Sequence, residues 1–312
     1  MNAESETTTG STAAGAMRPW PIDWVHGGAH LATIVLLLVY ASDAPGAGWW
    51  LLWDLVVLAL IAGLVALSPR RGLRRAARDR MLLTIVAIPV FFTQLGILVD
   101  RVNPNRFESR LAGFDRAVFF GRDPLELLEH VAHPLLTEYL QWVYDFYYFI
   151  PVILGAAVLK SGDVRALARM TQAFAVCIYL SYVGYYLVPA TGPNMDVFGL
   201  YDFRGPLEGV FLAGELRETL FAIEKIKLNC FPSGHTAVSL LSLLLARRAT
   251  PRTVPILTVL VVSLIFSTLY LRYHYFADVL AGILLAVASL AVARISHRSF
   301  ERRHWGGYGN EG

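Results

Sequence analysis

The amino-acid sequence predicts an all-α protein, a bundle of about eight helices that each cross a membrane. Three observations predict this fold class. Of the 312 residues, 55% are hydrophobic and only 16% are charged, whereas about a quarter of the residues in a soluble domain are charged. The hydrophobic residues are concentrated in eight runs along the chain. The arginines and lysines are concentrated in short segments between these runs.

The eight apolar runs are the predicted spans. A helix needs about 20 mostly apolar residues to cross the hydrocarbon core, because every backbone polar group must pair within the helix. The runs cover residues 24–41, 49–67, 81–99, 136–159, 171–188, 235–246, 253–270 and 277–295. The sixth run is short, so we expect its helix to extend from about Pro232 to near Arg248.

The basic segments predict the orientation, because lysine and arginine accumulate in cytoplasmic loops. Residues 68–80 contain six arginines, so we place this loop in the cytoplasm. Alternation then makes 160–169, 247–252 and the segment after 294 cytoplasmic, and all three are basic. Both termini are therefore expected on the cytoplasmic side of the plasma (inner) membrane. The two long segments, 100–135 and 189–234, are expected outside.

These expectations divide the chain into four parts. Residues 1–23 begin with a Ser-, Thr-, Ala- and Gly-rich stretch and are expected to form a disordered cytoplasmic tail. Residues 24–80 hold two additional spans and the basic loop. Residues 81–295 form the main membrane domain, and residues 296–312 form a basic cytoplasmic tail.

Composition argues against two other classes of protein. The net charge is only +3 and the basic residues form no single stripe, so we expect no nucleic-acid partner. Two cysteines, Cys177 and Cys230, are too few for a disulfide framework, and we expect both to be unpaired. His26 and His30 are interpreted as residues at the membrane interface.

Two polar motifs are expected to meet on the outer face. Pro232 is suited to the first turn of a helix, where the N–H groups of Ser233 and Gly234 and the helix dipole favour an anion. His274 and Asp278 are four residues apart and share one face of a helix. A carboxylate bound to one ring nitrogen leaves the other nitrogen free to attack. A histidine is commonly a packed, hydrogen-bonded residue, but the combination with His235 predicts covalent phosphoryl transfer.

The same segments resemble the PAP2 phosphatase and phosphotransferase superfamily. Residues 231–237 read Phe-Pro-Ser-Gly-His-Thr-Ala, and residues 270–282 read Tyr-Leu-Arg-Tyr-His-Tyr-Phe-Ala-Asp-Val-Leu-Ala-Gly. They are similar to that family's second and third motifs. The resemblance covers residues 81–295 and implies a six-helix PAP2-type catalytic core. Residues 111–124 (Leu-Ala-Gly-Phe-Asp-Arg-Ala-Val-Phe-Phe-Gly-Arg-Asp-Pro) and 189–193 (Pro-Ala-Thr-Gly-Pro) resemble the inositol phosphorylceramide synthase, or Aur1-like, branch.

The resemblance implies roles for individual residues. His274 resembles the nucleophile that forms a phosphohistidine, and Asp278 resembles the residue that orients it. His235 resembles the acid that protonates the leaving alcohol and later activates the acceptor. Ser233 and Gly234 resemble the residues that hold the phosphate. Histidines supply nucleophile and acid, so we expect no metal ion and no cofactor.

The sequence departs from the family pattern in its phosphate-binding cations. The usual first motif, a lysine followed seven residues later by Arg-Pro, is absent. Thr268 occupies the usual arginine position of the third motif. Arg272, one helical turn later, is expected to present its guanidinium to the same place. Further candidates are Arg204, Lys225 and Lys227, for which the alternative is a solvated loop charge.

Asp145 is an acid within a predicted span, where charged groups usually face a cavity or a partner. Glu138, Gln141 and Asp145 recur at helical spacing, so Asp145 is a candidate headgroup-binding residue. The alternative is a buried network that only stabilises packing.

Three functions remain open at this point. The first is a membrane phosphotransferase that moves a head group such as phosphoinositol from a phospholipid to a hydroxyl acceptor. The second is a PAP2-type lipid phosphate phosphatase, with water as acceptor. The third is a non-catalytic transporter or scaffold, against which the intact set of two histidines and one aspartate argues.

Overall fold

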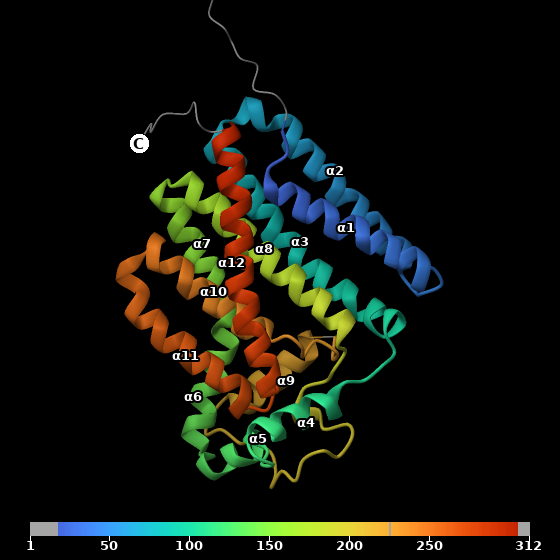
Figure 1. Cartoon of the computed structure of the whole chain (residues 1–312), viewed down its shortest axis with the longest axis vertical. Helices are drawn as coiled ribbons and strands as arrows, with labels where there is room; N and C mark the ends of the chain where they lie inside the picture. Colours follow the sequence, from blue (N-terminus) through green and yellow to red (C-terminus); the bar gives the residue numbers. More distant parts are fainter. Residues whose placement is uncertain (1–17, 225, 305–312) are drawn as a thin grey trace, which may run out of the picture.

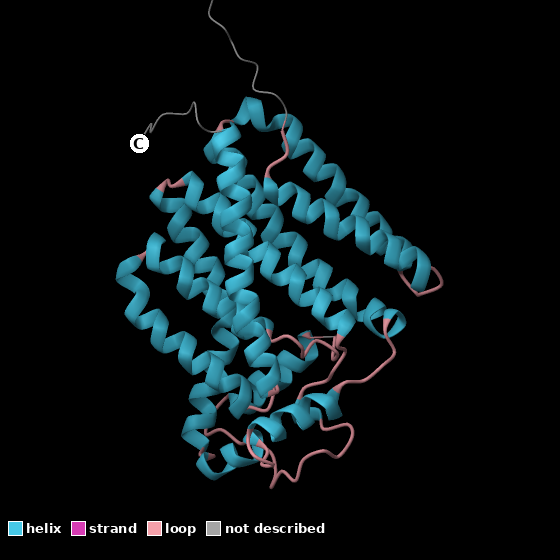
Figure 2. Ribbon diagram, viewed as in Figure 1, coloured by secondary structure: helices cyan, strands magenta, loops and turns pink. Residues whose placement is uncertain are grey.

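The computed structural model describes residues 18–224 and 226–304, and this part of the chain folds into helices and loops without a strand (Figure 2). The all-α prediction is confirmed. The helices form one bundle, with shorter helices gathered at one end (Figure 1).

Seven helical segments of the described chain are long and apolar enough to cross a membrane. Four of these segments are single uninterrupted helices: α1 (Pro21–Tyr40), α2 (Ala47–Arg71), α3 (Leu73–Val102) and α8 (Val164–Leu187). A fifth, Pro134–Ser161, joins α6 (Pro134–Asp145) and α7 (Ile150–Ser161) through a 3₁₀ turn, Phe146–Phe149. The last two contain α11 (Val254–Tyr270) and α12 (Phe276–His304). The protein is therefore a polytopic membrane bundle.

The predicted sixth span is α10 (Gly234–Ala249), whose 16 residues give a length of about 24 Å. This is less than the roughly 30 Å of a hydrocarbon core. Its ends lie within two residues of the expected limits, Pro232 and Arg248. Helix α10 packs against α8, α11 and α12, so neighbouring helices shield its irregular N-terminal approach from lipid.

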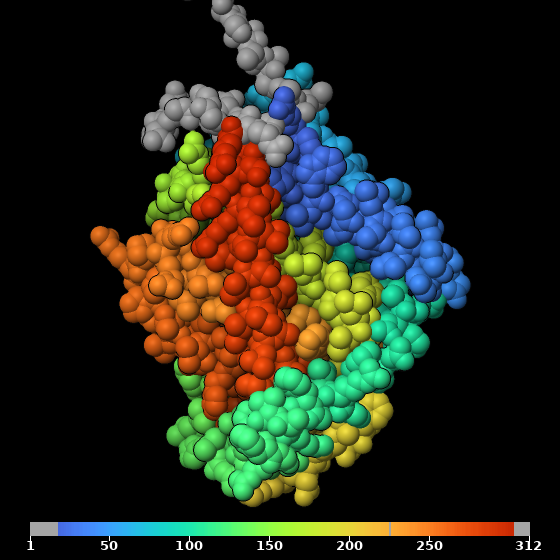
Figure 3. All heavy atoms as spheres, in the orientation of Figure 1, coloured from blue at the N-terminus to red at the C-terminus, as the bar shows by residue number. Residues whose placement is uncertain are grey.

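Three short helices cover one end of the bundle: α4 (Glu108–Val118), α5 (Pro124–Leu128) and α9 (Ala213–Ile223). Figure 1 shows the start of α1, the α2–α3 connection and the end of α12 together at the opposite end. In the space-filling view, α12 (red) runs along the surface toward the green segment that includes α4 (Figure 3). The α2–α3 connection, which is the most basic predicted loop, and the end of α12 therefore lie at the end of the molecule opposite to α4, α5 and α9.

Two predicted boundaries differ from the structure. Helix α1 already begins at Pro21, inside the expected tail of residues 1–23, and residues 1–17 lie outside the described chain. Helix α12 continues to His304, so the expected tail of residues 296–312 begins as helix. A single apolar helix can extend beyond the membrane surface without a break, which hydropathy alone does not reveal.

The interpretation of His26 and His30 as interfacial residues is wrong, because both are buried. His30 Nδ1 lies 2.6 Å from Asp54 Oδ1, and Gln94 donates to the other Asp54 oxygen at 2.8 Å. His26 bonds Thr84 Oγ1 and Tyr179 Oη, each at 2.8 Å. These polar contacts tie α1 and α2 to α3 and α8, as hydrogen bonds between membrane helices commonly do.

Candidate active site

The first histidine motif is held by the contact between α10 and α12. Ser233 caps α10, with its Oγ accepting from the Thr236 backbone N–H at 3.2 Å, and its own N–H donates to the Asp278 carbonyl at 3.0 Å. Gly282 allows this approach. A Cβ at that position would lie 2.6 Å from the Ser233 carbonyl oxygen and 3.0 Å from Thr236 Cβ. Only a glycine fits between the two helices without a shift.

The second motif forms the turn between α11 and α12. The backbone N–H groups of Tyr273 and His274 both donate to the Thr268 carbonyl at 3.0 Å. Asp115 of α4 accepts from the N–H groups of Phe276 at 2.7 Å and Ala277 at 2.8 Å. Burial raises the pKa of Asp115 to about 7, although the two backbone hydrogen bonds favour its ionised form. Asp115 therefore caps the helix that carries Asp278.

Asp115 was not predicted as a site residue, although it belongs to the segment 111–124 whose pattern resembles the synthase branch. Its position relative to α12 depends on a contact between residues more than 160 positions apart. The structure gives that sequence pattern a physical reason, namely an acid that caps α12.

The two histidines and the aspartate lie together, although His274 belongs to the turn before α12 and not to the helix that carries Asp278. His274 Nε2 lies 3.4 Å from His235 Nδ1, and His274 Nδ1 lies 3.2 Å from Asp278 Oδ2. The same carboxylate oxygen accepts from the Tyr275 backbone N–H at 2.9 Å. Asp278 is fully buried. A carboxylate held in this way keeps the proton on Nδ1 of His274 and leaves a lone pair on Nε2.

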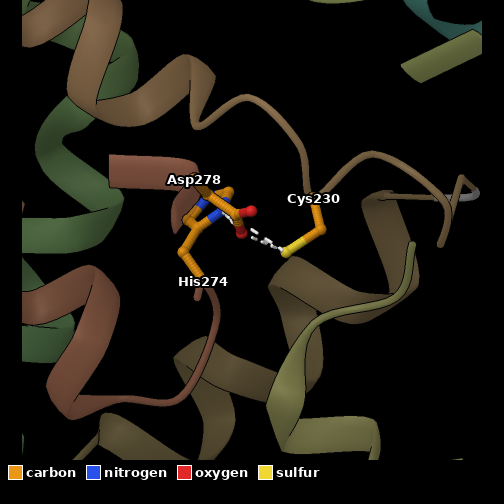
Figure 4. Close-up of side chains that lie close together, drawn as sticks. All are labelled: Cys230, His274 and Asp278. Carbon is orange, nitrogen blue, oxygen red and sulfur yellow. Dashed lines mark hydrogen bonds and ion pairs between the residues drawn. The ribbon is translucent and has the colours of Figure 1, made fainter. Parts of the chain in front are cut away.

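Cys230 is a further member of the cluster that sequence reasoning missed. Its Sγ lies 2.8 Å from Asp278 Oδ2 and 3.5 Å from His274 Nδ1 (Figure 4). Burial raises the pKa of the Cys230 thiol well above its ordinary value, and the Asp278 charge adds to this effect. The sulfur is therefore a neutral thiol that donates to the carboxylate. Both cysteines are unpaired, as expected.

The histidines line a cavity of about 640 Å³. Around them its wall is aromatic, with Tyr144, Tyr147, Tyr148 and Tyr273. Tyr144 stacks on the His235 ring with 4.4 Å between centroids. The cavity then follows α3, α7 and α8 along mostly apolar residues, among them Met81, Ile88, Phe92, Val152, Leu159, Met170 and Phe174. It combines a polar reactive end with a long apolar extension.

Of the predicted cations that the structure describes, Lys227 alone lines this cavity. Its Nζ donates to the carbonyls of Phe221 at 3.0 Å and Glu224 at 2.8 Å. Arg204 is exposed and lies outside the cavity wall. Lys225 lies outside the described residues.

Arg272 does not line the cavity of the histidines, contrary to expectation. Its guanidinium pairs with Glu129, donates to the Gly205 carbonyl at 2.8 Å and lies 3.9 Å from the Phe203 ring centroid. Burial lowers the pKa of Arg272, and the Glu129 charge opposes this. Helix α11 ends at Tyr270 and Arg272 has a φ of 62°. The expected one-turn relation to Thr268 therefore does not exist.

Asp145 is half-buried and accepts from Gln141 Nε2 at 3.2 Å, but it is not part of the cavity wall. Gln141 instead connects to the site, since its Oε1 accepts from Tyr273 Oη at 2.9 Å.

The acid in the cavity wall is Glu224, which sequence reasoning missed. Its Oε1 accepts from Tyr148 Oη at 2.8 Å. Burial raises the pKa of Glu224, while Tyr148, His274 and Lys227 lower it.

Ser233 and Gly234, two predicted phosphate-binding residues, have different environments. Ser233 is fully engaged as a helix cap, and its side chain is buried. Gly234 lines the cavity as the first residue of α10, where a backbone N–H has no preceding helical carbonyl as partner. A Cβ on Gly234 would lie 3.1 Å from Tyr185 Oη.

Comparison with known proteins agrees with this site. A PA-phosphatase related-family protein of Dictyostelium discoideum is 30% identical over 105 residues, which are 33% of this chain and 19% of that protein. The chain thus matches about a fifth of the length of this relative. No solved structure matches the chain. The model of the PAP2 superfamily matches residues 109–292, which include both histidine motifs, so the protein belongs to the PAP2 superfamily.

Proposed function

We propose that this protein is a metal-independent phosphotransferase that moves a head group such as phosphoinositol from a phospholipid to a hydroxyl acceptor. The observation that carries the proposal is the pair of facing histidines, one bound to Asp278, at the polar end of a long apolar cavity. PAP2 proteins are phosphatases or phosphotransferases, which supports an enzyme rather than a transporter or scaffold.

The contacts suggest how the reaction proceeds. Nε2 of His274 attacks the phosphorus atom, and the bond to the leaving alcohol breaks as His235 gives that oxygen a proton. In the second step His235 takes a proton from the acceptor hydroxyl, whose oxygen displaces His274 from phosphorus. Asp278 stabilises the positive ring of His274 in between. Gly234 N–H and Lys227 supply charge stabilisation near the phosphate.

The cavity favours a lipid donor with a hydroxyl-rich head group. The apolar extension along α3, α7 and α8 can accept an acyl chain. Glu224 in the wall disfavours the second negative charge of a phosphomonoester, whereas a phosphodiester carries only one. Its carboxylate also accepts hydrogen bonds from a polyol. Aromatic side chains around the histidines exclude water from the phosphohistidine. These features support the transferase and an Aur1-like assignment over the phosphatase.

Product analysis tests this function. Purified protein is incubated with labelled phosphatidylinositol or labelled phosphatidic acid, with and without a long-chain lipid alcohol. We expect a phosphoinositol-containing product that requires the alcohol, insensitive to EDTA and inhibited by vanadate, which mimics five-coordinate phosphorus. Release of inorganic phosphate from phosphatidic acid at the same rate with or without alcohol would establish the phosphatase instead.

We also propose that the site faces the outside of the plasma membrane and that both termini are cytoplasmic, with residues 81–295 as the catalytic domain. The basic α2–α3 connection and the end of α12, which lie at the end remote from α4, α5 and α9, support this orientation. On a background without cysteine, Asp202→Cys should react with a membrane-impermeant thiol reagent in intact cells. Arg252→Cys should react only after the cells are opened. The reverse pattern would place the chemistry in the cytoplasm.

A further inference from the structure

Cys230, His274 and Asp278 form a compact cluster whose chemistry goes beyond phosphoryl transfer. They come from the loop before α10, the α11–α12 turn and the first turn of α12. All three are buried, and one potential ligand atom from each lies within 4.8 Å of the others. Figure 4 shows the sulfur, the imidazole and the carboxylate directed toward one another.

Thiolate, imidazole and carboxylate are the ligands that zinc prefers in proteins. With bonds of about 2.0–2.3 Å, the ligand atoms of a tetrahedral zinc site lie about 3.3–3.7 Å apart. Here the Sγ–Nδ1 distance is 3.5 Å and the Nδ1–Oδ2 distance is 3.2 Å. Only the Sγ–Oδ2 distance, 2.8 Å, must increase.

Two further features suit a bound ion. Asp278 Oδ1 is buried and has no hydrogen-bond partner within the described part of the chain, so the carboxylate has an unused oxygen. Cys230 and His274 also line the large cavity, which gives an ion an entry path and leaves room for a fourth ligand such as water.

We propose that Cys230, His274 and Asp278 bind one zinc ion reversibly and that this ion switches the enzyme off. On binding, the Cys230 thiol releases its proton to solvent and its sulfur joins the metal. Zinc also takes the lone pair of His274 Nδ1, so the ring proton must move to Nε2. A protonated Nε2 has no lone pair with which to attack phosphorus. The inhibitory half of this proposal rests on the proposed function, whereas the binding half does not.

The two cysteines provide a matched pair of variants for measuring binding. Cys177 is buried in α8 and lies outside the cavity wall. Chelator-treated full-length protein is titrated with cadmium, a zinc substitute whose bond to a thiolate gives an ultraviolet charge-transfer band. The native protein and Cys177→Ser should show this band and bind one ion per chain. Cys230→Ser should show no band, and Asp278→Asn should bind more weakly.

Inhibition is measured by comparing each variant with its own activity in chelator. Zinc should inhibit the native protein and Cys177→Ser, and EDTA should restore activity. In Cys230→Ser, half-inhibition should need at least about tenfold more zinc, because losing even an outer-shell partner of a metal site costs about this much and Cys230 is a direct ligand of the proposed site. A cadmium band that persists in Cys230→Ser, or no binding to the native protein, would overturn the site. Zinc that activates chelator-treated protein would overturn the inhibition and would also contradict the metal-independent function.

Discussion

Replacing His274 by alanine should lower kcat by about 10⁶-fold, the loss expected when the covalent nucleophile of an enzyme is removed. In the proposed mechanism the His274 ring provides the atom that bonds to phosphorus, and no other described histidine contacts the Asp278 carboxylate. Turnover of labelled phosphatidylinositol in the presence of a lipid alcohol measures the effect. Helix content and the thermal unfolding temperature in detergent should stay close to those of the native protein.

The matched control is His130→Ala. His130 is an exposed histidine near α5, and its ring contacts only a local backbone carbonyl at 3.2 Å. This variant should keep native activity. Equal loss in both variants would point to a general effect of removing histidines, and near-native activity of His274→Ala would refute the nucleophile assignment.

His235→Ala and Asp278→Asn distinguish the roles of the remaining two groups. In the proposed mechanism His235 is the acid of the first step and the base of the second, so His235→Ala should lose turnover. Any acid-labile, alkali-stable label that forms after donor addition should persist on the protein, because the second step lacks its base. Asp278→Asn retains the nucleophile and disturbs only the tautomer of His274, so a small residual activity should remain. Label on the protein in His274→Ala would place the covalent bond elsewhere.

Local sequence was sufficient for the parts of the fold that depend on hydropathy and short spacing. The predicted run 235–246 corresponds to α10, which spans Gly234–Ala249. His274 and Asp278 are four residues apart and do meet, but His274 lies in the turn that leads into α12, which begins at Phe276. His235 joins them because its motif also marks a helix N-terminus.

The remaining site residues depend on contacts that no local pattern contains. Cys230 reaches Asp278 across 48 positions of the chain, and Glu224 reaches Tyr148 across 76. The prediction for Arg272 assumed a continuous helix, but the chain leaves the helix at Tyr270. The prediction for Asp145 assumed regular helical spacing, whereas a 3₁₀ turn follows it and Tyr147 and Tyr148 reach the cavity instead. The acid that contacts His30 is Asp54, which lies on a different helix.

Gly282→Ala should lower kcat by about a hundredfold without removing any reacting group, because a displacement of about 1 Å in a catalytic site costs this much. The added Cβ would lie 2.6 Å from the Ser233 backbone carbonyl oxygen, so α10 and α12 must move apart. His235 is carried by α10 and Asp278 by α12. The 3.4 Å approach of His274 Nε2 to His235 Nδ1 would then be lost. The same steady-state assay, with both kcat and KM measured, checks this prediction.

Gly63→Ala provides the comparison, because a Cβ at Gly63 in α2 meets nothing within 4 Å. In a helix, alanine is more favourable than glycine by about 1 kcal/mol, so this variant should be at least as stable as the native protein and fully active. Gly282→Ala gains the same helical preference, and its membrane insertion and helix content should therefore persist while its activity falls. Because no residue of α12 lines the cavity, the loss should appear in kcat with little change in KM. Native kcat in Gly282→Ala would show that the contact between α10 and α12 does not set the spacing of the two histidines.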